Sequence, residues 1–238
     1  MVVAPVNERG YARPELLVET EWLAGNLDNP RLRIIDTRAE PVYNEGHIPG
    51  AAALVKAGGI PRAENGEMVG PDEFAAIMGK LGISNDTTVV VYDAPGAAMG
   101  MLAWSLIYYG HRDVRMLDGG FAKWTAEGRP VSTEPSSYPQ ATFEAAPVEE
   151  LYCSLDHAKE TLGRAGTVFW DTRTPAEYEG KAPTGPNAPA RLGHLPGAVH
   201  LEWIELLDPE TRTFKPAGEL RTLLESRGIT PESEIDCY

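Results

Sequence analysis

Short apolar runs alternate with amphipathic segments along the first half of the chain. The apolar runs are residues 32–36 (LRIID), 88–93 (TVVVYD) and 114–120 (VRMLDGG), and the segments with helical periodicity are 18–26, 72–82 and 97–110. Apolar runs of this length, separated by helices, are typical of βα units whose strands form a parallel sheet. The pattern therefore predicts an α/β fold in which helices cover both faces of the sheet.

The chain contains the same pattern twice. Residues 34–54 (IIDTRAEPVYNEGHIPGAAAL) recur within 169–201 as FWDTRTPAEYEG followed by RLGHLPGAVHL. In each copy an apolar strand ends in Asp-Thr-Arg, and a Gly-His-aliphatic-Pro-Gly-Ala turn follows. The spacing continues to agree, because His47 precedes Tyr92 by 45 residues and His194 precedes Tyr238 by 44. An internal repeat of this size predicts two tandem domains.

The two copies share a helix and differ in one loop. Residues 71–84 and 216–230 carry the same amphipathic pattern, each with a glycine just past its end. Asp36 precedes His47 by 11 residues, whereas Asp171 precedes His194 by 23. The extra residues form a proline-rich stretch, KAPTGPNAPARL, which we expect to be a surface loop.

These features predict the domain organisation. We expect a first domain over residues 1–130, a proline- and serine-rich linker over 131–148, and a second domain over 149–238. Both are predicted to be parallel sheets flanked by helices. The first copy continues for about 40 residues beyond Tyr92, whereas the second stops at Tyr238. We therefore expect the second domain to be truncated before its functional loop.

Composition limits the partners. A net charge of −14 would repel phosphate backbones and anionic lipid, so nucleic acid and membranes are not expected to bind. Two cysteines are too few for a disulfide framework, and no targeting segment or apolar run of about 18 residues is present, which favours a cytoplasmic location. The histidines at 111, 157 and 200 lack the spacing of a metal site, and no phosphate-loop or dinucleotide motif occurs. No metal or other cofactor is expected.

Candidate chemistry lies at the carboxyl ends of the predicted strands, where open parallel sheets bind ligands. Asp36, Asp171 and Asp93 occupy such ends. Asp93 opens a loop of small residues before a helix, and such loops present backbone N–H groups to anions. A carboxylate at that point indicates an inactive relic or a helix cap. The same register in the second copy places the counterpart of Asp93 one residue after Tyr238.

Together these motifs resemble the tandem-domain rhodanese family, the thiosulfate and 3-mercaptopyruvate sulfurtransferases. The resemblance extends from about residue 17 to 238 and includes both Gly-His-x-Pro-Gly-Ala turns and GHRDVRMLDGGFAKWTAEGRPV. It implies a catalytically silent first domain and a nucleophilic cysteine directly after Tyr238. That cysteine would accept sulfur from a small anionic donor as a persulfide, and would pass it to cyanide, a thiol or a thioredoxin-like acceptor.

The resemblance also implies roles for charged residues. Arg173 is similar to the family arginine that binds the sulfonate or carboxylate of the donor, with Arg191 as a second candidate; the alternative for Arg173 is a surface ion pair with Glu177. Asp36 and His47 resemble a pair proposed to handle protons in mercaptopyruvate enzymes. A structural role for His47, fixing its own turn, is the favoured alternative because His194 repeats the motif.

Other interpretations remain open. Cys237 aligns with Val91 inside a strand, so we expect it to be buried and inert; it is the fallback nucleophile if the register is shifted. Cys153 is expected to be a small buried residue. The rival functions are a non-catalytic scaffold of two rhodanese-like domains, which Asp93 suggests for the first, and a phosphatase on a related fold. The donor, thiosulfate or 3-mercaptopyruvate, is not determined by this sequence.

Overall fold

The computed structural model describes residues 4–63, 67–94, 97–183 and 191–238, which form two compact units. The first runs to Leu151 and includes Pro209–Thr213, and the second comprises Tyr152–Asp208 and Phe214–Tyr238. Residues 131–148, which we expected to be a linker, belong to the first unit. Part of the proline-rich insertion, residues 184–190, lies outside the described residues.

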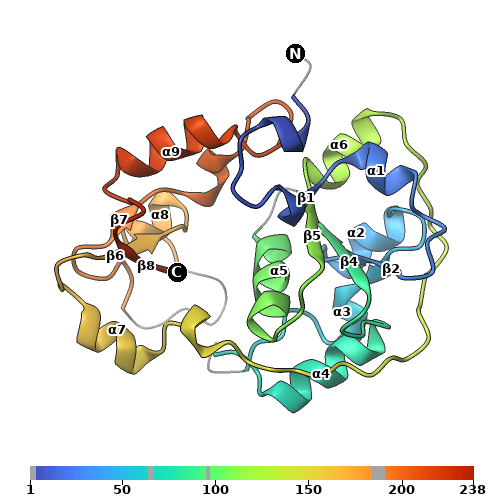
Figure 1. Cartoon of the computed structure of the whole chain (residues 1–238), viewed down its shortest axis with the longest axis horizontal. Helices are drawn as coiled ribbons and strands as arrows, with labels where there is room; N and C mark the ends of the chain where they lie inside the picture. Colours follow the sequence, from blue (N-terminus) through green and yellow to red (C-terminus); the bar gives the residue numbers. More distant parts are fainter. Residues whose placement is uncertain (1–3, 64–66, 95–96, 184–190) are drawn as a thin grey trace. The chain divides into compact units, whose positions relative to one another are not determined.

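A parallel sheet forms the centre of the first unit (Figure 1). Its strands are β1 (Leu17–Val18), β2 (Leu32–Asp36), β3 (Ala52–Ala53), β4 (Thr88–Tyr92) and β5 (Val114–Leu117), in the order β1-β5-β4-β2-β3. All the pairs are parallel. Val89 to Tyr92 are fully buried, because β4 lies between two strands and is covered on both faces.

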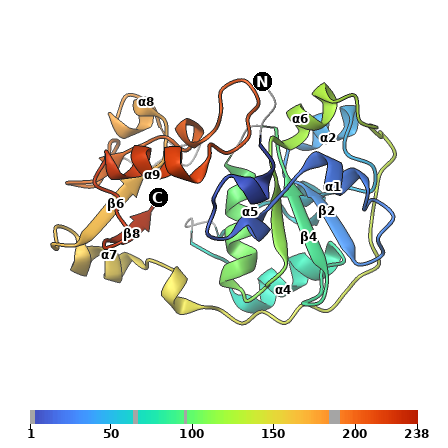
Figure 2. The same cartoon turned by 45° about the horizontal axis from the view of Figure 1, so that its top comes forward.

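Helices cover both faces of this sheet. They are α1 (Thr20–Ala24), α2 (Glu40–Glu45), α3 (Leu54–Ala57), α4 (Pro71–Lys80), α5 (Ala98–Tyr108) and α6 (Gly120–Ala126), with 3₁₀ turns η1 (Val6–Glu8), η2 (Pro14–Leu16) and η3 (Glu149–Leu151). On one face, Ile34 and Val90 pack with Leu23 of α1 and Trp124 of α6. Helix α5 packs on β4 and β5 from the other side, as Figures 1 and 2 show. The predicted α/β fold is confirmed.

The second unit contains a smaller parallel sheet. Its strands are β6 (Thr167–Asp171), β7 (Val199–His200) and β8 (Glu234–Cys237), in the order β7-β6-β8. The other elements are α7 (Leu155–Thr161), α8 (Pro175–Tyr178), η4 (Trp203–Leu206) and α9 (Ala217–Glu225). Figures 1 and 2 show α7 and α9 on opposite sides of these strands. The order β7-β6-β8 repeats the order β3-β2-β4 of the first unit.

The pairing register confirms the alignment of the two copies. Ile35 pairs with Val91 in the first sheet, and Trp170 pairs with Cys237 in the second. Beyond each pair, a threonine N–H donates to a tyrosine carbonyl: Thr37 to Tyr92 at 3.1 Å, and Thr172 to Tyr238 at 2.9 Å. Cys237 is therefore the counterpart of Val91, and Tyr238 is the counterpart of Tyr92.

The expectation that Cys237 is buried is wrong. Val91 is fully buried because β4 has β2 on one side and β5 on the other. Among the described residues, β8 pairs with β6 alone, and Cys237 is exposed. Ile235 shows the same effect, since 41% of it is exposed whereas its counterpart Val89 is fully buried. An edge strand cannot shield side chains that an inner strand buries.

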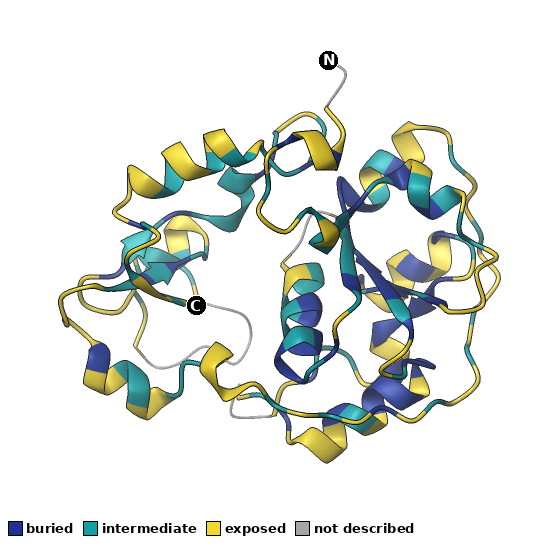
Figure 3. Ribbon diagram, in the orientation of Figure 1, coloured by how far each residue is buried: buried dark blue, intermediate teal, exposed yellow. Residues whose placement is uncertain are grey.

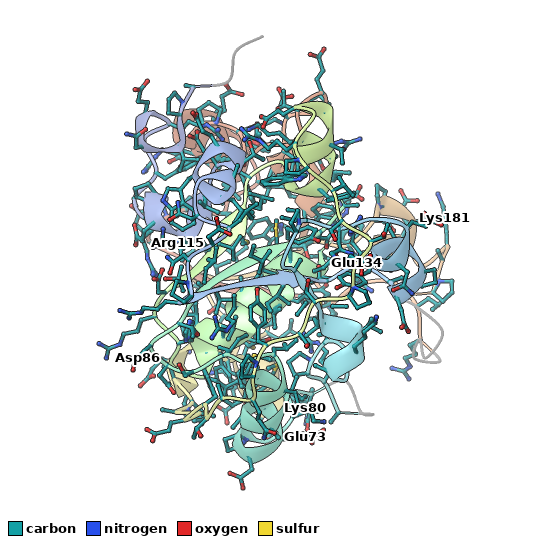
Figure 4. The ribbon with its side chains drawn as sticks, turned by 90° about the vertical axis from the view of Figure 1, so that its right-hand side faces the viewer. Glu73, Lys80, Asp86, Arg115, Glu134 and Lys181 are labelled. Atoms are coloured by element: carbon teal, nitrogen blue, oxygen red, sulfur yellow. The ribbon has the colours of Figure 1, made fainter. Side chains whose placement is uncertain are left out.

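The distribution of burial and charge agrees with a chain kept in solution by its acidic residues. Figure 3 shows the buried strands at the centre of the first unit and exposed residues along its rim. Charged side chains such as Glu73, Lys80 and Asp86 point outward (Figure 4). Across the described ranges, no helix is both long and apolar enough to cross a membrane.

Candidate active site

The Asp-Thr-Arg motif of the first unit forms a clamp at the end of β2. The buried carboxylate of Asp36 accepts hydrogen bonds from Arg38 Nε at 2.9 Å and Nη2 at 2.5 Å, and also from its backbone N–H at 2.9 Å. Arg38 Nη2 also donates to the carbonyl of Gly46 at 2.7 Å. The arginine thus ties the strand end to the turn that carries His47. Such a bidentate pair is both strong and directional.

A tyrosine phenol completes this clamp. The hydroxyl of Tyr92 donates to Asp36 Oδ2 at 2.6 Å and accepts a hydrogen bond from the N–H of Ile48 at 3.2 Å. Burial, and then the neighbouring Asp36 carboxylate, raise the pKa of Tyr92, so the phenol stays protonated and acts as a donor. Strand β4 is thereby fixed at its carboxyl end.

The second unit repeats the clamp. Arg173 Nε lies 3.0 Å from Asp171 Oδ1, and its Nη2 lies 2.5 Å from Oδ2 and 2.8 Å from the Gly193 carbonyl. Burial alone would raise the pKa of Asp171, but the hydrogen bonds from Arg173 lower it. Leu195 N–H donates to the hydroxyl of Tyr238 at 3.0 Å. Arg173 thus binds Asp171, and the Glu177 carboxylate accepts the N–H of Thr174 in a capping box that opens α8.

His47 is enclosed by backbone. Its ring stacks on Tyr43 at 3.9 Å, its Nδ1 lies 2.9 Å from the Tyr43 carbonyl, and its Nε2 lies 3.0 Å from the Glu134 carbonyl. The side chain is fully buried, and it shares no hydrogen bond with Asp36 among the described residues. Ser132 pairs with the backbone of His47, so residues 131–148 cover the ring. These contacts are those of a residue that holds a turn and the segment packed on it.

His194 makes only half of these contacts. Its ring stacks on Tyr178 at 3.7 Å and its Nδ1 lies 2.8 Å from the Tyr178 carbonyl, as in the first unit. The residue is exposed. Nearby, His200 Nε2 lies 2.8 Å from the Arg173 carbonyl. The local motif is therefore the same in both units, but the cover over the second ring is different.

Asp93 lies between β4 and α5 and is buried. Its Oδ2 accepts the N–H of Met99 at 3.2 Å, in the first turn of the helix. Burial raises the pKa of Asp93, against the hydrogen bonds from Met99 and from the Thr37 hydroxyl, which lower it. Its carbonyl accepts the N–H of Phe121 at 2.9 Å. Gly120 has φ +55° and a Cβ there would lie 2.5 Å from the Asp93 carbonyl oxygen, which explains this glycine of the Leu-Asp-Gly-Gly-Phe motif.

The rest of the small-residue loop is only partly described. Residues 95–96 lie outside the described residues, so the expected anion cradle after Asp93 is not described in full. The carboxylate of Asp93 nevertheless lies at the N-terminus of α5, where helix N–H groups favour a negative charge. The position that follows Tyr92 is therefore an anion position.

The two cysteines and Arg191 lie in the second unit. A pocket of about 140 Å³ is lined by Cys153, Cys237 and Tyr238, among others. Burial raises the pKa of Cys153 to about 11, so its thiol is protonated at neutral pH and is a poor nucleophile. Cys237 is exposed as a residue, yet shielding of its sulfur raises the pKa of this thiol as well. Arg191 is exposed and forms no ion pair with residues of known placement.

One group of side chains could hold a metal ion. Cys153, His157 and Asp236 each offer a ligand atom, and these atoms lie within 4.8 Å of one another. His157 Nε2 is already 2.9 Å from Glu234 Oε1. Three ligands, one of them committed to a carboxylate, make a weak case for a resident ion. The absence of a metal remains a prediction.

Several contributors were missed in the sequence. Tyr92 and Tyr238 were used only as markers of spacing, although their phenols bind the strand-end clamp and the following turn. Thr37 and Thr172 were treated as the middle of a motif, although their hydroxyls bind a tyrosine carbonyl. The signal was present, because all four residues repeat at matching positions.

Comparison with known proteins agrees with this architecture. The rhodanese-like domain family matches residues 19–127. The chain is 38% identical to the sulfur carrier protein TtuD of Thermus thermophilus, over 96% of this chain and 84% of that protein. It is 32% identical to a thiosulfate sulfurtransferase of Corynebacterium glutamicum, over 95% and 78% of the two chains.

A solved structure extends the comparison to both units. SseA from Escherichia coli, described as a 3-mercaptopyruvate sulfotransferase with a rhodanese fold, superimposes with a TM-score of 0.80 at 26% identity, covering 93% of this chain and 87% of that one. The repeated parallel sheets and strand-end clamps define a two-unit α/β protein of the rhodanese type. The chain belongs to the rhodanese family of sulfurtransferases.

Proposed function

We propose that this protein moves a sulfane sulfur from thiosulfate or 3-mercaptopyruvate to a thiol or cyanide, through a persulfide on a cysteine directly after Tyr238. One observation supports this most strongly. Tyr92 and Tyr238 end equivalent strands, and the residue after Tyr92 places its side chain at the N-terminus of α5. A thiol at the equivalent place would have its pKa lowered by helix N–H groups, and the thiolate is the reactive form.

The proposed chemistry balances in two steps. The thiolate attacks the outer sulfur of thiosulfate, an S–S bond to the enzyme forms, and sulfite leaves with the electron pair of the broken S–S bond. With 3-mercaptopyruvate the C–S bond breaks instead, and the carbon takes a proton to give pyruvate. An acceptor thiolate or cyanide then attacks the terminal sulfur of the persulfide, and the enzyme thiolate is released.

Charged residues are proposed to guide the donor. Arg191 is the stronger candidate for direct contact, because it is exposed and carries no ion pair among the described residues. Arg173 would contribute positive charge from within its clamp with Asp171. Asp36 and His47 could handle a proton only after the cover over His47 opens, so we propose that they hold the turn. The proposed physiological acceptor is a cytoplasmic thiol or a thioredoxin-like protein.

Cyanolysis assays test this function. We expect thiocyanate to form from at least one of the two donors, and alkylation of the protein thiols before the assay to abolish it. Activity that survives complete alkylation would contradict the persulfide. The alternative is a non-catalytic scaffold, favoured by the buried carboxylate at Asp93; it predicts no thiocyanate with either donor.

A further inference from the structure

Two threonines make the same pair of hydrogen bonds in the two units. Thr37 donates its N–H at 3.1 Å and its hydroxyl at 3.0 Å to the carbonyl of Tyr92. Thr172 donates its N–H at 2.9 Å and its hydroxyl at 3.0 Å to the carbonyl of Tyr238. A carbonyl can accept two hydrogen bonds, so both lone pairs are used. The hydroxyl bond is therefore additional to a backbone bond that already holds the strand end.

The direction of the strands places Thr172 beside the residue after Tyr238. Trp170 pairs with Cys237, and side chains two residues apart share one face of a sheet. Thr172 therefore lies on the same face as Cys237 and the second residue beyond it. In agreement, the Thr172 hydroxyl bonds to the Cys237 sulfur and lowers the pKa of this thiol, against the larger effect of burial.

The first unit shows the equivalent position occupied. Asp93 follows Tyr92, and its carboxylate accepts hydrogen bonds from the Thr37 hydroxyl and from Met99 N–H. The Thr37 hydroxyl thus lies within reach of two acceptors, the Tyr92 carbonyl and an anionic side chain on the next residue. No loop residue is needed for the first of these anion contacts, because Thr37 belongs to the neighbouring strand end.

We propose that the Thr172 hydroxyl is a hydrogen-bond donor to the reacting sulfur, which turns from the Tyr238 carbonyl to the thiolate when the thiol loses its proton. This inference rests on the proposed function, since it requires a nucleophilic cysteine after Tyr238. The turn leaves the carbonyl bonded to Thr172 N–H, so no buried acceptor loses its last partner. The same donor would stabilise the persulfide anion before sulfur leaves.

The test compares Thr172→Val with Thr172→Ser. Valine keeps the shape but removes the donor, whereas serine keeps the donor. The rate of alkylation by iodoacetamide is measured against pH, and peptide masses distinguish the nucleophile from Cys153 and Cys237. We expect Thr172→Val to raise the pH midpoint by about one unit, which lowers the rate about tenfold below the midpoint. Thr172→Ser is expected to retain the parent profile.

Thr37→Val provides the matched control. It removes the same hydroxyl bond to a tyrosine carbonyl in the first unit, so it reports any purely structural effect and is expected to leave the alkylation profile unchanged. An unchanged midpoint in Thr172→Val, with thiocyanate still formed by the parent protein, would overturn the inference alone. A parent protein that forms no thiocyanate would overturn the proposed function and this inference together.

Discussion

The two units carry the same clamp in different surroundings. Asp36 with Arg38, and Asp171 with Arg173, make nearly identical bonds at the ends of equivalent strands. Yet the Arg38 side chain is 5% exposed and that of Arg173 is 21% exposed. Figure 3 shows the same contrast between the buried strands of the first sheet and the partly exposed strands of the second. Local motifs determine the bonds, and neighbouring elements determine how much those bonds contribute.

The largest expected effect comes from breaking the buried clamp. Asp36→Asn leaves the Arg38 guanidinium buried without its countercharge, and such a loss costs about 3–5 kcal/mol. Asp171→Asn should cost less, about 1–2 kcal/mol, because water reaches Arg173 and replaces part of the lost interaction. Hydrogen exchange of β2 with β4, and of β6 with β8, measures the two effects in one chain. Equal losses in the two units would contradict the role given to burial.

The histidine pair should show a smaller difference. His47→Ala removes a stacked ring and its bonds to two carbonyls, so we expect the first unit to lose about 2–3 kcal/mol. It should also speed proteolysis within residues 131–138. His194→Ala removes an exposed ring with one carbonyl bond, and a loss below about 1 kcal/mol is expected. Denaturant titration and limited digestion with a nonspecific protease check both variants; similar protease sensitivity of parent and His47→Ala would exclude the covering role.

The two strand-end carboxylates should respond to pH in opposite directions. The raised pKa of Asp93 means that its contribution to stability is present at low pH and is lost as the pH rises from its unfolded pKa through its folded pKa. The lowered pKa of Asp171 gives a contribution that is present above its unfolded pKa and is lost as the pH falls through its folded pKa.

Asparagine variants separate these slopes. Asp93→Asn should remove a decrease in stability with rising pH, and Asp171→Asn should remove an increase, each by about 1.4 kcal/mol per unit of pKa difference. Denaturant midpoints between pH 3 and 8 measure the slopes. Slopes that change in the same direction in both variants would contradict the assigned pKa directions.

The smallest effect concerns the segment packed on the first unit. The hydroxyl of Tyr138 donates to the Gly50 carbonyl at 2.7 Å and accepts the N–H of Ile34 at 3.2 Å. Tyr138→Phe should cost about 1 kcal/mol, since two bonds are lost but the ring still packs against Arg33. A calorimetric melting curve is the measurement. A stability equal to that of the parent would show that this segment is held by its backbone alone.

The sequence predicted the strand ends and their register well. The repeated Asp-Thr-Arg and Gly-His-x-Pro-Gly segments have fixed spacing in both copies, and short-range bonds within them produce the same clamp wherever they occur. The alignment of Cys237 with Val91 followed from this spacing and is confirmed. Motif repetition is reliable here because the interactions that it encodes lie within a few residues of the strand ends.

Burial and the packing of irregular segments were not predictable in this way. Cys237 has the local pattern of a strand residue, but its exposure depends on which strands lie beside β8. Residues 131–148 have no periodicity, yet single side chains fix them: Tyr138 bonds to the backbone of the first unit and Phe143 is buried. Such contacts join residues distant in the sequence, and no local pattern announces them.

The most direct test of the central claim is the site of sulfur loading. The protein is incubated with thiosulfate, digested without reductant and examined by peptide mass. The equivalence of the two strand ends predicts the added mass of one sulfur atom on the residue directly after Tyr238, removed by cyanide. Sulfur on Cys237 or Cys153, or on no residue at all, would contradict it.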